Sequence, residues 1–341
     1  MEKSKSDNGA RAVIRKWLPW IVTTAIFVYL FKRIPVDEVL EAAVRVDLPA
    51  FLALIIFGLF FHFFWDILVY AYTFNLFGTS VTYRGMMWIR GATYLLSLLN
   101  YMVGQGGFSL IMNRWKEISI SRATSVVLFC IMIDYYVLLA LCLAGAFSLP
   151  GVDINQLFVI SDEGHLVRFI VISWALFAVH IGFYRRLLPR SKGFEWVKQN
   201  EVLASFREAP VIRYVKLILL RSVSSLVGIV VTYYALGTFG IHVPLLELSV
   251  MLPLVWLIGA IPITVMGMGT VQAAMILFVA GYAQGVGNPQ DMEAAVLAYS
   301  LLSSLLHRLG LFIIGAFCIA RVPRSLWAPK NDGNIYQPAL D

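Results

Sequence analysis

The sequence predicts an all-α protein that crosses a membrane several times. Hydrophobic residues make up 60% of its 341 residues and charged residues 14%, and the mean hydropathy is +0.78. Several apolar runs are long enough to cross a hydrocarbon core of about 30 Å. Two glycine-rich segments interrupt the apolar pattern, and each leads into a long apolar helix. We therefore predict about six full spans plus two re-entrant hairpins.

Six apolar runs have the length and composition that a spanning helix requires. They cover residues 15–31, 48–77, 120–149, 165–184, 214–238 and 293–320. The first run follows a basic segment and lacks a small-residue cleavage site, so we interpret it as a retained helix or signal anchor. The three cysteines, Cys130, Cys142 and Cys318, all lie in predicted spans. They therefore indicate packing residues, not a disulfide framework or a metal site.

The first glycine-rich segment predicts a re-entrant helical hairpin over residues 85–113. Its break is expected at Gly104, Gly106 and Gly107, because glycine allows left-handed conformations and close backbone approach. The arm that follows these glycines, residues 108–112, is too short to cross the membrane. The chain is therefore expected to return to the side from which it entered.

The second glycine-rich segment predicts a similar hairpin over residues 245–283. Its break is expected around Pro262, Gly267 and Gly269, and its longer arms also allow a pair of short spans. Irregular backbone at membrane depth is tolerated only where it is buried in protein or lines a wet cavity. The two breaks together therefore predict a central polar site.

The distribution of basic residues predicts which side of the membrane each loop faces. Residues 185–216 include eight basic and three acidic side chains, which indicates a cytoplasmic loop, and basic residues near both termini place these in the cytoplasm as well. Residues 149–165 include no Lys or Arg and are expected to face outward. Basic residues flank the first hairpin but not the second. The hairpins should therefore open to opposite sides, as in inverted-topology repeats.

These expectations give a single membrane domain, residues 1–341, built from two inverted repeats. Its parts are an N-terminal tail and first helix at 1–47, a first repeat at 48–184, a cytoplasmic basic loop at 185–213, a second repeat at 214–322 and a C-terminal tail at 323–341. The first hairpin lies inside the first repeat and the second hairpin inside the second.

Two ionisable residues, His62 and Asp66, lie four positions apart in the apolar run 48–77. This spacing places them on one helical face. Ionisable groups inside a membrane are costly and often functional, so the pair is a candidate proton or polar relay. Two alternatives remain open. The pair forms a polar clamp between helices, or it supplies the acid and base of an enzyme, although no serine nucleophile accompanies it.

A second set of ionisable residues lies at equivalent positions of the two repeats. Asp134 is about halfway along the helix after the first hairpin, and His307 and Arg308 are about halfway along the helix after the second. We predict that Asp134 and Arg308 approach each other or share a cavity, because an unpaired charge at this depth would be expensive. They form either a buried ion pair that ties the repeats together or a direct contact with the substrate.

Basic residues of the first hairpin form a candidate site for a lipid phosphate. Arg90 lies in the first arm, and Arg114 and Lys116 follow the second. The alternative is ordinary positive-inside anchoring, which fits Lys116 best and Arg90 least. Arg221 lies about a turn and a half inside its span, and we expect its side chain to snorkel to the inner interface.

Uncharged polar side chains accompany the two breaks. Asn100 and Gln105 lie beside the first break, and Thr264 and Gln272 lie beside the second. They are candidates for binding a polar headgroup. Alternatively, they satisfy backbone groups that a broken helix leaves unpaired.

The sequence gives no support to several classes of function. It contains no Walker A motif, dinucleotide fingerprint, HExxH zinc motif or pair of metal-binding aspartates, so we expect no cofactor and no metal. The net charge of +7 arises from basic residues in short loops beside helices. Such residues orient a membrane protein, and a nucleic-acid partner is therefore not expected.

The segment from Pro262 to Gln272 combines a proline, two glycines and a glutamine, and a long helix with an arginine at mid-depth follows it. The segment from Asn100 to Asp134 combines a glycine break, a basic turn and the entry to a helix. In both segments, and over roughly residues 15–322, the chain resembles the lysylphosphatidylglycerol synthase transmembrane family. That family includes flippase domains and archaeal and hopanoid-associated relatives. Gln272 and Phe108 stand where relatives usually carry glutamate, which favours a phosphate, neutral sugar or terpenoid lipid over a cationic headgroup.

The resemblance implies a lipid flippase or transporter in the bacterial inner (cytoplasmic) membrane, with a membrane lipid or lipid-linked molecule as its partner. The chain lacks the aminoacyl-transferase domain of some relatives, so catalysis is not expected. One alternative is an intramembrane lipid-modifying enzyme that uses His62 and Asp66. The other is a non-catalytic scaffold that would have lipid-biosynthetic proteins as partners. The oligomeric state is left open.

Overall fold

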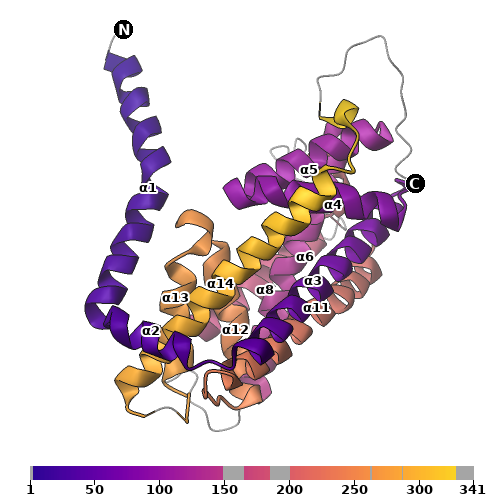
Figure 1. The fold of residues 1–341 in the computed structure, drawn as a ribbon. Coiled ribbons are helices and arrows are strands. Elements are labelled where there is room, and N and C mark those ends of the chain that lie inside the picture. The colour runs from indigo at the N-terminus through magenta and orange to yellow at the C-terminus, as the bar shows by residue number, and fades with distance from the viewer. Residues whose placement is uncertain (1–2, 149–164, 185–199, 262, 286, 328–341) are drawn as a thin grey trace. The chain divides into compact units, whose positions relative to one another are not determined.

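The computed structural model describes residues 3–148, 165–184, 200–261, 263–285 and 287–327. Within these ranges the regular structure is helical, apart from one isolated antiparallel bridge between His242 and Gln284. Figure 1 shows the helices, coloured from the N-terminus to the C-terminus. The predicted all-α fold is therefore confirmed.

The chain divides into two compact units. One consists of Met1–Ile55, Ala144–Phe158 and Ile229–Leu305, and the other, which we call the second unit, consists of Ile56–Leu143, Val159–Gly228 and Leu306–Asp341. The described residues leave out nearly all of the predicted outward loop 149–165, most of the basic loop 185–213 and both ends of the chain. The predicted repeats and the predicted orientation in the membrane therefore stay predictions.

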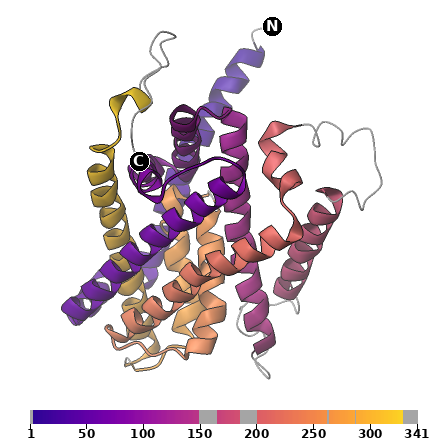
Figure 2. The same ribbon diagram turned by 90° about the vertical axis from the view of Figure 1, so that its right-hand side faces the viewer.

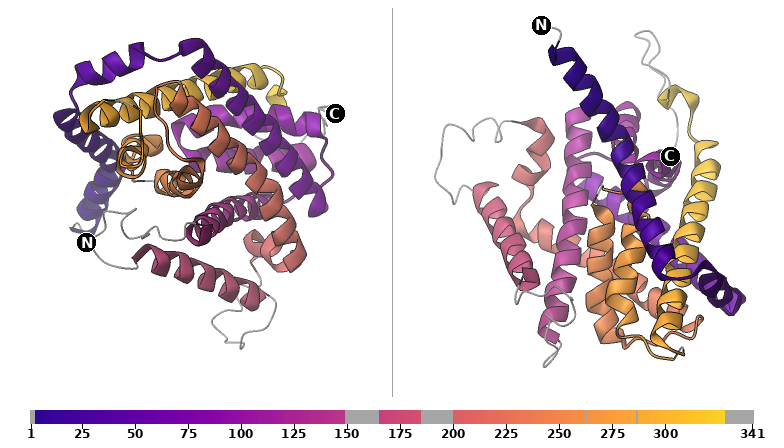
Figure 3. Two further views of the ribbon diagram at one scale, coloured as in Figure 1. Left: turned by 90° about the horizontal axis from the view of Figure 1, so that it is seen from below. Right: turned by 90° about the vertical axis from the view of Figure 1, so that its left-hand side faces the viewer.

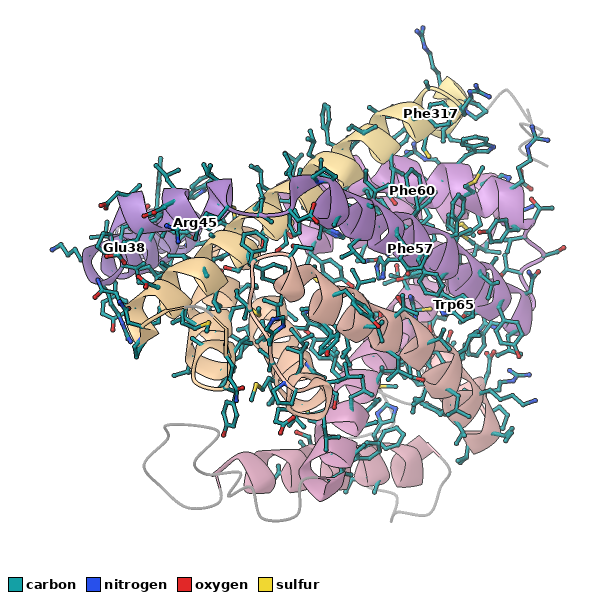
Figure 4. All side chains as sticks on the ribbon, turned by 60° about the horizontal axis from the view of Figure 1, so that its bottom comes forward. Glu38, Arg45, Phe57, Phe60, Trp65 and Phe317 are labelled. Carbon is teal, nitrogen blue, oxygen red and sulfur yellow. The ribbon has the colours of Figure 1, made fainter. Side chains whose placement is uncertain are left out.

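Among the residues that the structure describes, four helices are long and apolar enough to cross a membrane. They are α3 (Leu48–Leu76), α6 (Ile120–Ser148), α11 (Val211–Gly237) and α14 (Pro289–Ile319). In the most apolar window of each, 17–44% of the residues are buried inside the protein. Many of the remaining apolar side chains, among them Phe57, Phe60 and Phe317 (Figure 4), are exposed. Such apolar surfaces suit a hydrocarbon surrounding rather than water.

The first predicted span is part of α1 (Lys3–Arg33), which bends by 83° into α2 (Val36–Val44). Pro35 stands at the bend with an extended backbone, as expected for a residue that cannot continue a helix. If α1 and α2 together form one span, the number of apolar spans rises to five. The ion pair between Arg33 and Glu293 (2.5 Å) ties the end of α1 to α14.

The predicted span 165–184 forms α8 (His165–Tyr184), which is not among the four long apolar candidates. In the second unit, α8 lies beside α6 (Figures 2 and 3). The rings of Tyr136 and Phe177 meet there with a centroid separation of 4.0 Å. The predicted helix is confirmed, whereas its passage through the membrane stays a prediction.

The first interrupted segment forms two helices, α4 (Tyr83–Leu99) and α5 (Tyr101–Lys116), which pack against each other. The predicted position of the break was wrong. The break lies at Asn100, whose backbone is extended (φ −164°, ψ 134°). The side chain of Asn100 accepts hydrogen bonds from the backbone N–H groups of Met102 (2.8 Å) and Val103 (3.4 Å). Asn100 therefore caps α5, and the glycines that follow it are helical.

Two of the three glycines of α5 lie at the contact between α4 and α5 and do not mark a break. A Cβ atom on Gly104 would lie 1.9 Å from Ser97 Oγ, and one on Gly107 would lie 2.4 Å from Leu96 Cδ1. A Cβ atom on Gly106 would meet nothing within 4 Å. Gly104 and Gly107 therefore allow α5 to approach α4 closely, as small residues do at contacts between membrane helices.

The second interrupted segment has its break where the sequence predicts it. Helix α12 (Leu245–Ala260) ends before the break, and α13 (Thr270–Met275) follows it and continues into a π-helical turn, η4 (Ile276–Ala280). Gly267 and Gly269 have positive φ angles of 73° and 87°, which glycine adopts without strain. Pro262 lies outside the described residues.

An ion pair joins α6 to the short helix α10 (Ala204–Glu208). Arg122 donates two hydrogen bonds to Glu208, from Nη1 to Oε1 (2.8 Å) and from Nη2 to Oε2 (2.6 Å). These bonds hold the pKa of the Glu208 carboxyl below its ordinary value of about 4.5. Because the folded pKa is depressed, the stabilisation is present above pH 4.5 and is lost as the pH falls through the folded pKa.

A Glu208→Gln variant should therefore melt below the wild type at pH 7, and the difference should shrink toward pH 4. We expect a loss of less than about 1 kcal/mol, because the pair is partly exposed. Thermal unfolding in detergent across this pH range measures the effect. The control is Glu201→Gln, because among the described residues the Glu201 carboxylate accepts only a long hydrogen bond, from Ser119 (3.5 Å). An equal and pH-independent loss in both variants would contradict the prediction.

Candidate functional site

Four charged residues meet in the interior of the second unit. Asp66 comes from α3, Arg90 from α4, Asp134 from α6 and Arg221 from α11. We call these residues the charged cluster. Two guanidinium groups and two carboxylates balance each other, as buried charges must. The four residues lie far apart in the sequence, so the packing of the helices creates the cluster.

Asp66 lies at the centre of the cluster and is buried. Its Oδ2 atom accepts hydrogen bonds from Arg90 Nε (2.8 Å) and from the Tyr94 hydroxyl (3.2 Å). Its Oδ1 atom accepts a hydrogen bond from Arg221 Nη1 (2.5 Å). A single carboxylate therefore joins two guanidinium groups that belong to different helices. Trp65, the residue before Asp66, donates a hydrogen bond from Nε1 to the Leu220 carbonyl (2.8 Å) and fixes α11 beside α3 (Figure 4).

Arg90 also contacts α5. Its Nη1 atom donates to Gln105 Oε1 (3.2 Å), which the Tyr70 hydroxyl approaches as a second donor (3.5 Å). The Tyr70 ring lies 4.3 Å from Arg90 Cζ and 5.0 Å from Arg221 Cζ, and the Phe108 ring lies 5.2 Å from Arg90 Cζ. Aromatic faces stabilise cations at these distances. Phe108 therefore belongs to the wall of the cluster.

Arg221 lies in the interior, so the predicted snorkelling of its side chain was wrong. The side chain is 5% exposed, and its Nε atom lies 3.0 Å from Asp134 Oδ1. The buried carboxylate of Asp66 and the neighbouring carboxylate of Asp134 keep Arg221 in the interior, because a buried carboxylate requires a cation. The Asp134 side chain is 41% exposed. The cation that the structure places at Asp134 is thus Arg221, and the predicted approach of Arg308 to Asp134 stays a prediction.

Three buried donor atoms of this region have no hydrogen-bond acceptor among the described residues. They are Gln105 Nε2, Arg221 Nε and Arg221 Nη2. The contact between Arg221 Nε and Asp134 is an ion pair by distance, but its geometry is not that of a hydrogen bond. Buried donors without acceptors cost about 1–3 kcal/mol each. The cluster is therefore balanced in charge and incomplete in hydrogen bonding.

His62 lies one helical turn from Asp66 and is exposed. Its Nδ1 atom forms a hydrogen bond with Ser224 Oγ of α11 (2.9 Å). Helix α14 approaches α3 nearby, where a Cβ atom on Gly310 would lie 2.1 Å from Leu59 Cδ2. His307 of α14, one turn from Gly310, is also exposed and lies within electrostatic range of His62. The two residues of the predicted relay thus both contact α11, but His62 bonds to Ser224 and Asp66 to Arg221.

Several other predicted site residues form structural hydrogen bonds. Asn100 caps α5, and Arg114 donates from Nη1 to the Leu326 carbonyl (2.9 Å). Gln272 accepts from the Gly269 N–H (2.7 Å) and donates to the Ser300 carbonyl (3.3 Å). Gln272 therefore caps the start of α13, in the first of the two units.

The sequence marked Asp66, Arg90, Gln105 and Asp134 as candidates but missed the roles of Tyr70, Tyr94 and Arg221. An arginine within the apolar run 214–238 was the available signal for Arg221. The described residues include no group of three or more His, Cys, Asp or Glu side chains arranged to hold a metal ion. Comparisons of the chain with models of protein families, with curated proteins and with solved structures find no match.

Proposed function

We propose that the protein is a lipid transporter, which moves a lipid or lipid-linked molecule between the leaflets of the bacterial inner membrane. The charged cluster would be the polar site through which the headgroup passes. The observation that carries the proposal is a buried, incompletely bonded set of charges inside helices whose outer surfaces are apolar. The resemblance to flippase domains agrees with it.

Energetics support a functional reading of the cluster. Replacing a buried ion pair by well-packed apolar residues is often neutral or stabilising, so stability alone does not require two arginines and two aspartates at this place. Charged groups inside membrane helices commonly mark a substrate pathway. During transport the headgroup would exchange contacts with the cluster, while the lipid tails would remain in the hydrocarbon.

The enzyme alternative has less support. Both carboxylate oxygens of Asp66 accept hydrogen bonds, one from Arg221 and the other from Arg90 and Tyr94. A carboxylate held in this way by two cations is a poor proton acceptor, whereas a general base needs a free oxygen and a suitable pKa. We therefore assign Asp66 to the architecture of the transport site.

Reconstitution into vesicles tests the proposal. Vesicles would carry a trace of a lipid with a fluorescent acyl chain, in parallel sets with anionic, zwitterionic and sugar headgroups, and dithionite would bleach the outer leaflet. We expect the wild type to accelerate bleaching of the inner-leaflet pool of at least one lipid. An Arg221→Gln variant should lose at least about tenfold in rate, whereas the control Arg45→Gln, at the exposed residue that follows α2 (Figure 4), should not. Rates equal to protein-free vesicles for every headgroup would overturn the proposal.

A further inference from the structure

The residues of the charged cluster differ in burial and in hydrogen bonding, which indicates a kind of ligand. Resting on the proposed function, we infer that Arg221 is the receptor for a phosphate group and that Asp134 is an internal counter-ion held at the place of that phosphate. The ligand class is thus a phosphate-bearing headgroup or free phosphate. Four features of the cluster lead to this assignment.

The two carboxylates of the cluster are not equivalent. Asp66 is buried, and its oxygens accept hydrogen bonds from both guanidinium groups. Asp134 is 41% exposed and contacts Arg221 through one oxygen without hydrogen-bond geometry. Without Asp134, Asp66 would balance two cations and leave one positive charge in excess. Asp134 is therefore the carboxylate that neutralises Arg221, and replacing it by another anion breaks no hydrogen bond to Arg221.

The open edge of Arg221 has the shape of an oxyanion receptor. Nη1 donates to Asp66, whereas Nε and Nη2 have no acceptor among the described residues. Nε and Nη2 point the same way from a planar guanidinium, so together they can bind two oxygens of one phosphate or carboxylate. Asp134 now lies at the Nε end of that edge (3.0 Å) and leaves Nη2 unfilled.

A third open donor lies in the same region. Gln105 directs Oε1 toward Arg90 and Tyr70, which leaves its Nε2 buried and without an acceptor in the described part of the chain. Tyr70 connects this amide to Arg221, because the Arg221 guanidinium lies 5.0 Å from its ring. The three buried atoms of this region that have no hydrogen-bond partner among the described residues are all donors. They favour a ligand that is rich in acceptor oxygens. Phosphate has this property, and an ammonium headgroup does not.

The exchange of one anion for another keeps the charge of the cluster balanced. A bound phosphate would replace the Asp134 carboxylate at Arg221, and Asp134, already partly exposed, would turn away. The buried guanidinium is then paired before and after binding, which avoids the large penalty of an uncompensated buried charge. Asp134 is predicted to compete with the ligand, so its neutralisation should strengthen binding.

Binding measurements on purified protein in phosphatidylcholine-free detergent micelles test this assignment. The probes are inorganic phosphate and a short-chain phosphatidic acid, each measured by isothermal titration calorimetry. Asp134→Asn and Asp134→Ser should bind at least one probe about tenfold more tightly than the wild type. Arg221→Gln combined with Asp134→Asn should bind below the wild-type affinity. The Asp37→Asn control makes the same change of charge on exposed α2 and should leave affinity unchanged.

The two probes identify the source of the phosphate. Tightening for phosphatidic acid alone assigns a lipid headgroup, and tightening for inorganic phosphate as well assigns a site that also accepts the free ion. Unchanged or weaker binding of both probes by the folded Asp134 variants would overturn the inference. Binding and translocation are measured separately. If the protein moves lipid but the Asp134 variants bind no more tightly, the proposed function stands and the counter-ion role is refuted. If the variants bind more tightly but the protein moves no lipid, the counter-ion role stands and the proposed function is refuted.

Discussion

An Asp66→Asn variant is expected to lose about 3–5 kcal/mol of folding free energy, the range found when one partner of a buried ion pair is removed. The exchange keeps the size of the side chain but leaves Arg90 and Arg221 buried with only the partly exposed Asp134 as counter-charge. It also turns one oxygen acceptor into an N–H donor beside two cations. Unfolding by sodium dodecyl sulfate, followed by circular dichroism, gives the change in free energy.

The matched control for this exchange is Asp134→Asn. It makes the same chemical change in the same cluster, but Arg221 keeps its hydrogen bond to Asp66, and the Asp134 side chain is already 41% exposed. We expect a smaller loss than for Asp66→Asn, because Arg221 keeps its hydrogen-bonded counter-ion. Equal losses in the two variants would show that Asp66 is not the central anion of the cluster.

A Gly104→Ala variant is expected to be destabilised by about 1–3 kcal/mol or more, as is usual for overpacking. The added Cβ atom would lie 1.9 Å from Ser97 Oγ and 2.8 Å from the Ser97 Cα atom. The side chain can turn aside, but the backbone cannot, so α5 would have to move away from α4. The free energy of unfolding in sodium dodecyl sulfate reports the loss.

Gly106→Ala provides the control within the same helix. Its Cβ atom would meet nothing within 4 Å, and alanine is favoured over glycine in a helix by about 1 kcal/mol. This variant should therefore be as stable as the wild type or slightly more stable. If both alanines changed the stability alike, the close contact between α4 and α5 at Gly104 would be refuted.

The long apolar runs made most of the helices predictable. The predicted spans 48–77, 120–149 and 214–238 end within a few residues of α3, α6 and α11, because a chain that crosses hydrocarbon must satisfy its backbone within each segment. The second break was also predictable, since Gly267 and Gly269 adopt φ angles that favour glycine. Local chemistry determines these features, and local chemistry is visible in a sequence.

The first break and the pairing of charges depend on tertiary packing, which a single sequence does not display. Glycine marks both a helix break and a close helix contact, and at Gly104 the contact was the correct interpretation. Asn100 carried the signal for the break, because asparagine is a preferred N-cap. Asp66 was recognisable as a buried charge, but its partner Arg221 lies 155 positions away, and only packing brings them together.

The shared carboxylate of Asp66 also bears on how the protein can move. Because one side chain holds Arg90 of α4 and Arg221 of α11 at once, sliding either helix past α3 would expose an uncompensated charge to a medium of low polarity. These three helical segments should therefore travel as one rigid body through any cycle of conformations. Helix α6 contributes Asp134, whose ion pair with Arg221 lacks hydrogen-bond geometry. The hinge of the motion is thus best sought between α6 and that rigid body.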